Sequence, residues 1–200
     1  MDEYSFNTTI DYYNNTAESY FNNTVKIDMS SLYAKFIKEI PVGGRILDVG
    51  CGSGRDSKYF IDNKFGVVPI DASVKMCEIA SKYIGVKALN VNILELDYEM
   101  EFDGVWACAS LLHIFREKQR DALKILVKAL KIGGVLYASW KYGNTERFES
   151  DRSFCDMDEE FITQMIGTID GVKIVEIWRT ADNKPNTNEE WINLLIQKVE

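Results

Sequence analysis

The chain has 200 residues, 46% apolar and 27% charged, which is the composition of a single globular domain with a core of its own. Its formal net charge of −8 argues against a surface built mainly for nucleic acid, because phosphate recognition normally shows as a basic face. We therefore expect a small-molecule substrate and no DNA partner.

The N-terminus and the cysteines favour a cytoplasmic protein without a membrane partner. The first residues, 1–4, are acidic and polar and lack the features of a signal peptide. The longest apolar run, near 105–112, is less than half of the roughly 20 residues that span a bilayer. The scattered cysteines form no C-x-x-C pair or Cys/His cluster, so we expect buried thiols and no metal site. They are Cys51, Cys77, Cys108 and Cys155.

Helix and strand patterns alternate along the chain. Apolar residues recur at helical spacing in 11–25 and 28–40, and residues 1–43 are expected to form a helical cap over the active site. Strands are predicted at 45–49, 66–70, 86–91, 102–109, 135–140, 172–180 and 191–199. Further helices are predicted at 54–63, at 73–83, around 123–130 with Gly133-Gly134 closing it, and at 158–167.

This order predicts an α/β fold. Residues 44–200 should form a Rossmann-like, doubly wound, mostly parallel sheet of seven strands with helices on both faces, compact with the cap. No helix separates the last two strands, so they suggest a hairpin with the last strand antiparallel. Ligands of such sheets bind beyond the carboxyl ends of the strands, near the point where strand order reverses.

The most informative motif is Asp48-Val49-Gly50-Cys51-Gly52-Ser53-Gly54-Arg55, between the first strand of the sheet and the next helix. Such a turn places backbone N–H groups against a cofactor, although a tight packing turn is the alternative. The dinucleotide fingerprint needs its third glycine at position 55, which is Arg55 here. Asp48 is unfavourable beside a pyrophosphate but suits a ligand with a positive charge, which it can favour directly or by fixing donors of the loop.

With Asp71 at the end of the second strand, this loop resembles that of the class I S-adenosylmethionine-dependent methyltransferases. The resemblance runs from about residue 10 to the C-terminus and includes 103–113 and 133–138. Residues 50–57 and Ser110-Leu111-Leu112-His113 are also similar to bacterial methyltransferases of the tellurite-resistance type. The resemblance implies an enzyme that transfers the methyl group of S-adenosylmethionine to a small molecule by direct substitution.

The expected cofactor site combines residue chemistry with this resemblance. Glycines let the backbone approach the methionine moiety, and Asp71 has the spacing from Gly50 of a carboxylate that accepts from ribose hydroxyls. Asp71 can alternatively cap the next helix. The resemblance implies adenine contacts from 91–93, where Asn92 replaces the Asp of many relatives. The expected cofactor-binding residues are Asp48, Gly50, Cys51, Gly52, Ser53, Gly54, Arg55, Asp71, Ala72, Asn92, Ile93, Ala109 and Ser110.

Two residues are catalytic candidates. His113, the only histidine, follows the fourth strand, and its near-neutral pKa suits a general base; a packing role is the alternative. Tyr13, with Tyr12 and Phe21, can face the sulfonium in a cation–π arrangement, or the three can simply belong to an amphipathic helix. Methyl transfer from a sulfonium requires alignment more than a base.

Substrate specificity is expected in the N-terminal helix and in 142–157, a polar segment that we predict to be a surface excursion. The expected substrate-binding residues are Tyr12, Tyr13, Lys141 and Arg147. With Arg152, the two cations flank the segment, where they can bind an anionic substrate or lie in a solvated loop.

Other functions stay open. A tRNA or protein acceptor lacks a visible basic platform, and a non-catalytic S-adenosylmethionine-binding protein is compatible with the same loop. An NAD-dependent oxidoreductase is disfavoured by Asp48 and Arg55. Amino-group DNA methyltransferases of this fold need a Pro-Pro segment where the chain reads Cys108-Ala109-Ser110-Leu111. We expect a monomer or a homodimer.

Overall fold

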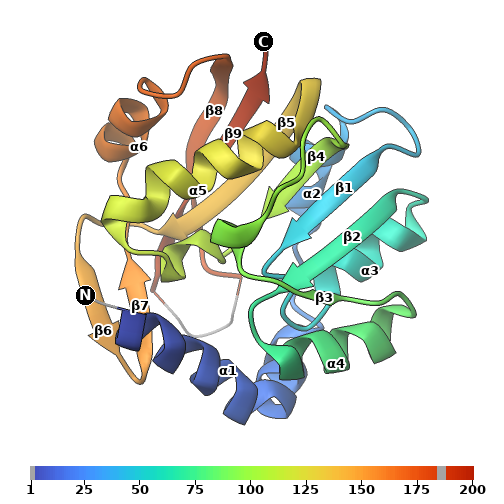
Figure 1. Ribbon diagram of the computed structural model, residues 1–200, viewed down its shortest axis with the longest axis vertical. Coiled ribbons are helices and arrows are strands. Elements are labelled where there is room, and N and C mark those ends of the chain that lie inside the picture. The colour runs from blue at the N-terminus through green and yellow to red at the C-terminus, as the bar shows by residue number, and fades with distance from the viewer. Residues whose placement is uncertain (1–2, 184–187) are drawn as a thin grey trace.

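A seven-stranded sheet forms the centre of the molecule (Figure 1). The computed structural model describes residues 3–183 and 188–200, so residues 1 and 2 of the predicted cap lie outside it. The strand order is β3-β2-β1-β4-β5-β9-β8. The strands are β1 (Arg45–Val49), β2 (Gly66–Asp71), β3 (Leu89–Asn90), β4 (Phe102–Ala107), β5 (Leu130–Lys141), β8 (Val172–Ala181) and β9 (Glu190–Lys198).

The predicted doubly wound fold is confirmed. Strands β1 to β5 are parallel, and β9 runs antiparallel to both of its neighbours, β5 and β8. The last strand of the chain is therefore the antiparallel one, as expected. The helices are α1 (Glu3–Thr24), α2 (Ser30–Ile37), α3 (Arg55–Asp62), α4 (Val74–Ile84), α5 (Arg116–Ala129) and α6 (Glu159–Ile166). Among the described helices, none has the length and apolar character needed to cross a membrane.

The central strands supply two cores, one on each face of the sheet. Successive side chains of a strand point to opposite faces, so Val105 and Ala107 of β4 pack with α5 and α6, whereas Trp106 packs with α2 and α3. Trp106 stacks on Tyr137 of β5, with ring centroids 4.0 Å apart. Burial on both faces explains why β4 is almost entirely apolar.

Helix α2 packs closely on β4 because Gly104 has no side chain. A Cβ atom at Gly104 would lie 2.4 Å from Ile40 Cδ1 and 2.8 Å from Phe36 Cζ. Both Ile40 and Phe36 are buried in the core that contains Trp106. The second helix of the predicted cap thus lies against the sheet, and only α1 lies at the carboxyl ends of the strands (Figure 1).

Three predicted boundaries were wrong. The third strand is limited to Leu89–Asn90, and β4 ends at Ala107 because the following loop puts Ala109 in the left-handed region, with φ 52°. Gly133-Gly134 closes no helix, since α5 ends at Ala129 and both glycines lie inside β5. There the β4–β5 register shifts, and Gly133 has φ 83°.

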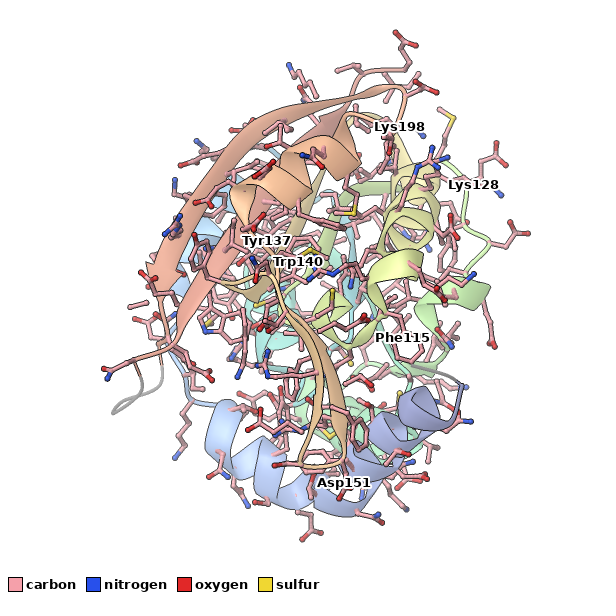
Figure 2. All side chains as sticks on the ribbon, turned by 90° about the vertical axis from the view of Figure 1, so that its left-hand side faces the viewer. Phe115, Lys128, Tyr137, Trp140, Asp151 and Lys198 are labelled. Carbon is pink, nitrogen blue, oxygen red and sulfur yellow. The ribbon has the colours of Figure 1, made fainter. Side chains whose placement is uncertain are left out.

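The segment 142–157 was predicted to be a polar surface excursion, which is wrong for its second half. It contains a hairpin of β6 (Glu146–Glu149) and β7 (Arg152–Cys155), with Asp151 at its tip beside α1 (Figure 2). Ser153, Phe154 and Cys155 are buried, and the Ser153 N–H donates to Thr9 Oγ1 of α1 at 2.9 Å. Contact with this helix, far away in the sequence, explains the burial.

Gly104→Ala should lower the free energy of unfolding by about 1–3 kcal/mol, because the new methyl group overlaps Ile40 and Phe36. Gly66→Ala is the matched control, since nothing lies within 4 Å of its added Cβ, and should stay within about 0.5 kcal/mol of wild type. Urea denaturation measures both. Equal stabilities would contradict the close packing of α2 on β4.

Candidate functional site

Two adjoining cavities lie at the carboxyl ends of the strands, with α1 forming a wall of both. Strand order reverses between β1 and β4, and the loops that follow these two strands meet there. The larger cavity has a volume of about 280 Å³ and the smaller about 90 Å³. Residues that line both are Tyr13, Tyr20, Gly50, Gly52, Ala109 and His113.

The glycine loop requires its glycines for two reasons. Gly50, Gly52 and Gly54 have φ values of 70°, 51° and 77°, which L side chains rarely adopt. In addition, a Cβ atom at Gly50 would lie 2.5 Å from Ser110 Cβ, and one at Gly52 would lie 3.2 Å from Tyr20 Cε1. The loops after β1 and β4 can therefore approach each other only when position 50 carries no side chain.

Asp71 fixes the loop from the end of β2. Its Oδ2 accepts from the Gly52 N–H at 2.9 Å, and its Oδ1 accepts from the Ser73 N–H at 2.8 Å. Burial raises the pKa of Asp71, while these two N–H donors oppose the rise. Each carboxylate oxygen keeps a second lone pair, so Asp71 can also accept from hydroxyl groups in the smaller cavity that it lines.

The rest of the smaller cavity is mostly apolar with a few polar groups. Asn92 Oδ1 accepts from the Leu94 N–H at 3.0 Å. Ser110 Oγ is buried and, within residues 3–183 and 188–200, has no hydrogen-bond partner. A buried hydroxyl without a partner is costly, so Ser110 is suited to a polar ligand group. The lining also includes Ala72, Met76, Val91, Ile93 and Ile114.

Asp48 lies beneath the loop and lines neither cavity. It is 2% exposed, and its Oδ2 accepts from Ser57 Oγ of α3 at 2.5 Å. Burial raises the pKa of Asp48, and the neighbouring Asp56 carboxylate raises it further. In this geometry Asp48 positions the start of α3, and it makes no direct contact with a ligand in either cavity.

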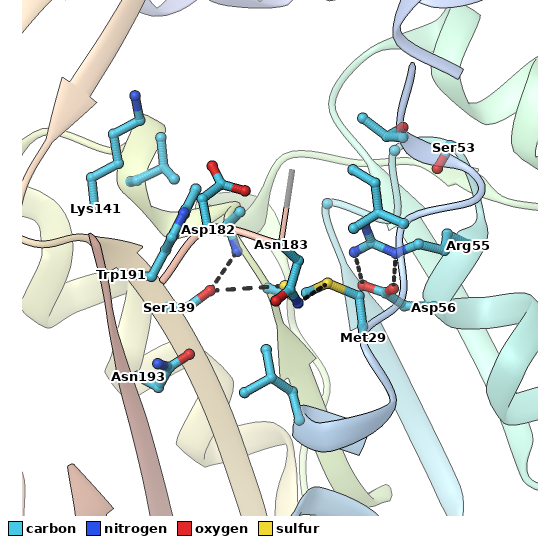
Figure 3. Close-up of a pocket in the computed structure, with 18 of the residues that line it drawn as sticks. Met29, Ser53, Arg55, Asp56, Ser139, Lys141, Asp182, Asn183, Trp191 and Asn193 are labelled. Carbon is cyan, nitrogen blue, oxygen red and sulfur yellow. Dashed lines mark hydrogen bonds and ion pairs between the residues drawn. The ribbon is translucent and has the colours of Figure 1, made fainter. Parts of the chain in front are cut away.

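Asp56, which the sequence did not single out as a site residue, organises the floor of the larger cavity. It accepts from Arg55 Nε at 2.6 Å, Trp106 Nε1 at 2.8 Å and Tyr33 Oη at 2.5 Å (Figure 3 shows the Arg55 pair). Although burial opposes ionisation, Arg55 and the hydrogen bonds lower the pKa of Asp56. The Arg55 charge facing the cavity is therefore balanced by Asp56.

Tyr13 and His113 form a hydrogen-bonded pair at the junction of the cavities. His113 Nδ1 lies 2.7 Å from Ser153 O, and a carbonyl can only accept, so Nδ1 carries the proton. Burial lowers the pKa of His113 to about 4, and the Arg152 and Lys141 cations add to the effect. In the resulting neutral ring, Nε2 accepts from Tyr13 Oη at 2.8 Å.

The wall of the larger cavity contains residues that sequence reasoning missed. Tyr137 and Ser139 belong to β5 and Asn193 to β9, and Tyr137 Oη donates to Asn193 Oδ1 at 2.7 Å. Ser139 Oγ accepts from the Ala109 N–H at 2.9 Å, and Figure 3 shows Ser139, Asn193 and Trp191 around the cavity. Alternation along β5 was the available signal. Tyr137, Ser139 and Lys141 are spaced two residues apart, so their side chains lie on the same face near the end of the strand.

The structure brings most of the predicted site residues to the cavities, with four exceptions. Asp48, Gly54, Tyr12 and Arg147 line neither cavity. The predicted residues that do line one or both are Tyr13, Gly50, Cys51, Gly52, Ser53, Arg55, Asp71, Ala72, Asn92, Ile93, Ala109, Ser110, His113 and Lys141.

Comparison with known proteins agrees with this architecture. Residues 46–134, from β1 into β5, match a family described as a methyltransferase domain. This part of the chain is therefore similar to methyltransferase domains. The sheet extends beyond the matched residues, since β8 and β9 complete it.

Relatives of this chain include proteins that are named as methyltransferases. A putative methyltransferase, YqeM, of Bacillus subtilis is 28% identical over 72% of this chain and 62% of its own length. A tRNA (carboxymethyluridine(34)-5-O)-methyltransferase of Arabidopsis thaliana is 34% identical over 54% of this chain and 26% of its own length. The chain thus spans less than two thirds of either relative.

A solved structure matches the whole fold of this chain. It is the Burkholderia thailandensis 1,6-didemethyltoxoflavin-N1-methyltransferase with bound 1,6-didemethyltoxoflavin and S-adenosylhomocysteine. The TM-score is 0.78 at 17% identity, and the match covers 97% of this chain and 88% of that one. At this identity the likeness establishes the fold.

The buried imidazole should make stability depend on pH. Because the folded pKa of His113 is about 4 and the unfolded value is about 6.5, the unfolded chain binds a proton first as pH falls. The contribution of His113 to the free energy of unfolding is complete above about pH 6.5 and is lost towards pH 4. Its size is about 2 kcal/mol, which is less than the full shift would give, because the imidazole keeps some solvent contact.

His113→Asn isolates this effect, because its amide can still donate to Ser153 O but does not titrate. Urea denaturation between pH 7 and pH 4.5 should show a smaller loss of stability for the variant than for wild type. Carboxylates that titrate in this range are common to both proteins. Parallel pH profiles would show that His113 is not buried as a neutral ring.

Proposed function

We propose that the protein is an S-adenosylmethionine-dependent methyltransferase that acts on a small-molecule acceptor. The observation that carries the proposal is the pairing of Asp71 with the glycine loop at the strand-order switch, next to the buried, unpartnered Ser110 hydroxyl. Solved neighbours of this fold with S-adenosylmethionine or S-adenosylhomocysteine bound support the choice of cofactor.

The smaller cavity would hold the adenosine part of the cofactor. Asp71 would accept from the ribose hydroxyls, while Asn92, Ile93 and Ser110 would surround the adenine. Gly50 and Gly52 would leave the backbone open to the methionine part, since both line the two cavities. When bound, the cofactor supplies a methyl group already activated by a sulfonium.

The larger cavity would hold the acceptor, and the protein would mainly align it. Tyr13 lies where the cavities join, so its ring and hydroxyl can orient an acceptor towards the cofactor side. His113 keeps Tyr13 in place through Nε2 and would act as a base only when this hydrogen bond opens. Helix α1, as the cap, would exclude water from both ligands.

A tRNA acceptor is the second candidate, because one relative is named as a tRNA methyltransferase. The net charge of −8 opposes it, since RNA binding normally requires a basic surface. The narrower similarity to tellurite-resistance methyltransferases makes selenite and tellurite reasonable test acceptors. A non-catalytic cofactor-binding protein would share the smaller cavity and differ only in lacking turnover.

Calorimetric titration should detect binding of S-adenosylmethionine and none of NAD. Gly50→Ala should weaken S-adenosylmethionine at least about tenfold, because its Cβ crowds Ser110 and the backbone is strained. Gly85→Ala is the matched control: its φ of 76° carries the same strain, but nothing lies within 4 Å of the added Cβ. Binding of NAD alone would refute the cofactor assignment.

Methyl transfer is tested with labelled S-adenosylmethionine and a panel of acceptors. The panel contains thiols, amines, carboxylates, selenite, tellurite and bulk tRNA, and we expect label in at least one small molecule and none in tRNA. Label confined to tRNA would overturn the proposed acceptor class. Cofactor binding without label in any acceptor, including a cell extract, would favour the non-catalytic alternative.

A further inference from the structure

Three cations surround one aromatic ring at the edge of the larger cavity. Lys141 Nζ and the guanidinium carbons of Arg147 and Arg152 each lie 5.0 Å from the centroid of the Phe154 ring. They come from three different strands, β5, β6 and β7. Cations at this distance from a ring face are attracted to it, but the three positive charges also repel one another.

Two of these cations are neutralised by carboxylates. Lys141 pairs with Glu189, and Arg147 pairs with Asp156. Arg152 forms no ion pair with any residue in the described parts of the chain, and its buried Nε has no hydrogen-bond partner there. Arg152 is therefore the one cation of the three whose charge has no carboxylate partner in the described parts of the chain.

Arg152 is also held in a defined position. Its guanidinium lies 4.4 Å from the centroid of the Tyr12 ring as well as over Phe154, so it is held between two rings from different elements. It lines the larger cavity together with Tyr13 and His113. The Arg152 cation opposes the rise in the pKa of Tyr13 and adds to the fall in the pKa of His113, which places its charge beside both groups.

Two carboxylates that line the same cavity are paired with other cations. Asp56 pairs with Arg55, and Glu189 pairs with Lys141. A partly buried cation without a counter-ion is unfavourable, and an anion that enters the cavity would relieve this cost.

We propose that Arg152 binds the carboxylate of an anionic methyl acceptor in the larger cavity. The proposal rests on the methyltransferase function proposed above and names the class of its acceptor. The guanidinium offers parallel N–H donors that match the two oxygens of a carboxylate. The bound carboxylate would lie next to Tyr13, and so next to the junction with the smaller cavity.

Arg152 takes no part in the bond changes and acts as a binding residue. The acceptor's nucleophilic atom would form a bond to the methyl carbon while the bond between methyl and sulfur breaks, and a hydroxyl or thiol acceptor would lose its proton to solvent. The electron pair of that bond stays on sulfur, which gives S-adenosylhomocysteine and a methylated acceptor.

Matched acceptors test the proposal by turnover. 4-Hydroxybenzoate is compared with 4-hydroxybenzamide, and 3-mercaptopropionate with 3-mercaptopropionamide, so that each pair differs only in the charged group. In wild type, kcat/KM should be at least about tenfold higher for the carboxylate members, and Arg152→Gln should abolish this preference. Arg120→Gln, whose exposed guanidinium donates to Thr168 O away from the cavity, is the control and should keep the preference.

A binding measurement decides the question without turnover. His113 is the only histidine, so its imidazole proton signals in the NMR spectrum are unambiguous. With S-adenosylhomocysteine present at constant pH, sodium benzoate should shift these signals saturably in wild type, and benzamide should not. The response to benzoate should disappear in Arg152→Gln and persist in Arg120→Gln.

The outcomes separate the two proposals. If S-adenosylmethionine and S-adenosylhomocysteine bind neither wild type nor variant, the methyltransferase function itself fails. If the cofactor binds but benzoate gives no shift, or gives the same shift in Arg152→Gln, the anionic acceptor is overturned while the function stands. Equal kcat/KM for the charged and neutral members in wild type would overturn it as well.

Discussion

The structure depends on one buried carboxylate, Asp56, whose charge requires several hydrogen-bond donors. Asp56 accepts hydrogen bonds from Tyr33 in α2, from Trp106 in β4 and from its neighbour Arg55 at the start of α3. A charge this deeply buried is tolerated only with several donors, so these three elements are fixed relative to one another. The glycine loop is directly connected to them through Arg55, and the position of the cofactor cavity follows from this arrangement.

The same network shifts the pKa values of two neighbouring carboxyl groups in opposite directions. Asp56 has the cation and the donors, so its pKa is lowered, whereas Asp48 has only Ser57 and a like charge nearby, so its pKa is raised. One negative charge thus remains under the loop and is paired with Arg55. Our sequence reasoning allowed Asp48 to favour a positive ligand either directly or by fixing donors of the loop. In the structure Asp48 lines neither cavity and accepts from Ser57 of α3, whereas Arg55 lines the larger cavity.

Local patterns were enough for the sheet, the glycine loop and the residues at the ends of the first four strands. Parallel strands buried on both faces are readily recognised, and the carboxyl ends of neighbouring strands lie together. What could not be predicted depends on contacts between distant segments. Asn193 reaches the cavity because β9 inserts between β5 and β8, and Ser153 is buried because α1 covers β7. Neither contact between distant segments produces a periodic pattern in the sequence of β9 or of β7.

Helix α1 is attached at both ends of the site. Thr9 holds the hairpin through the Ser153 N–H, and Asn14 Oδ1 accepts from Ser73 Oγ at the start of α4. Between these attachments and beyond them, Tyr13 and Tyr20 line both cavities. Because one helix forms a wall of both cavities, a movement of α1 would open both of them together. Under the proposed function, the release of the used cofactor and of the methylated acceptor would then depend on the same conformational change.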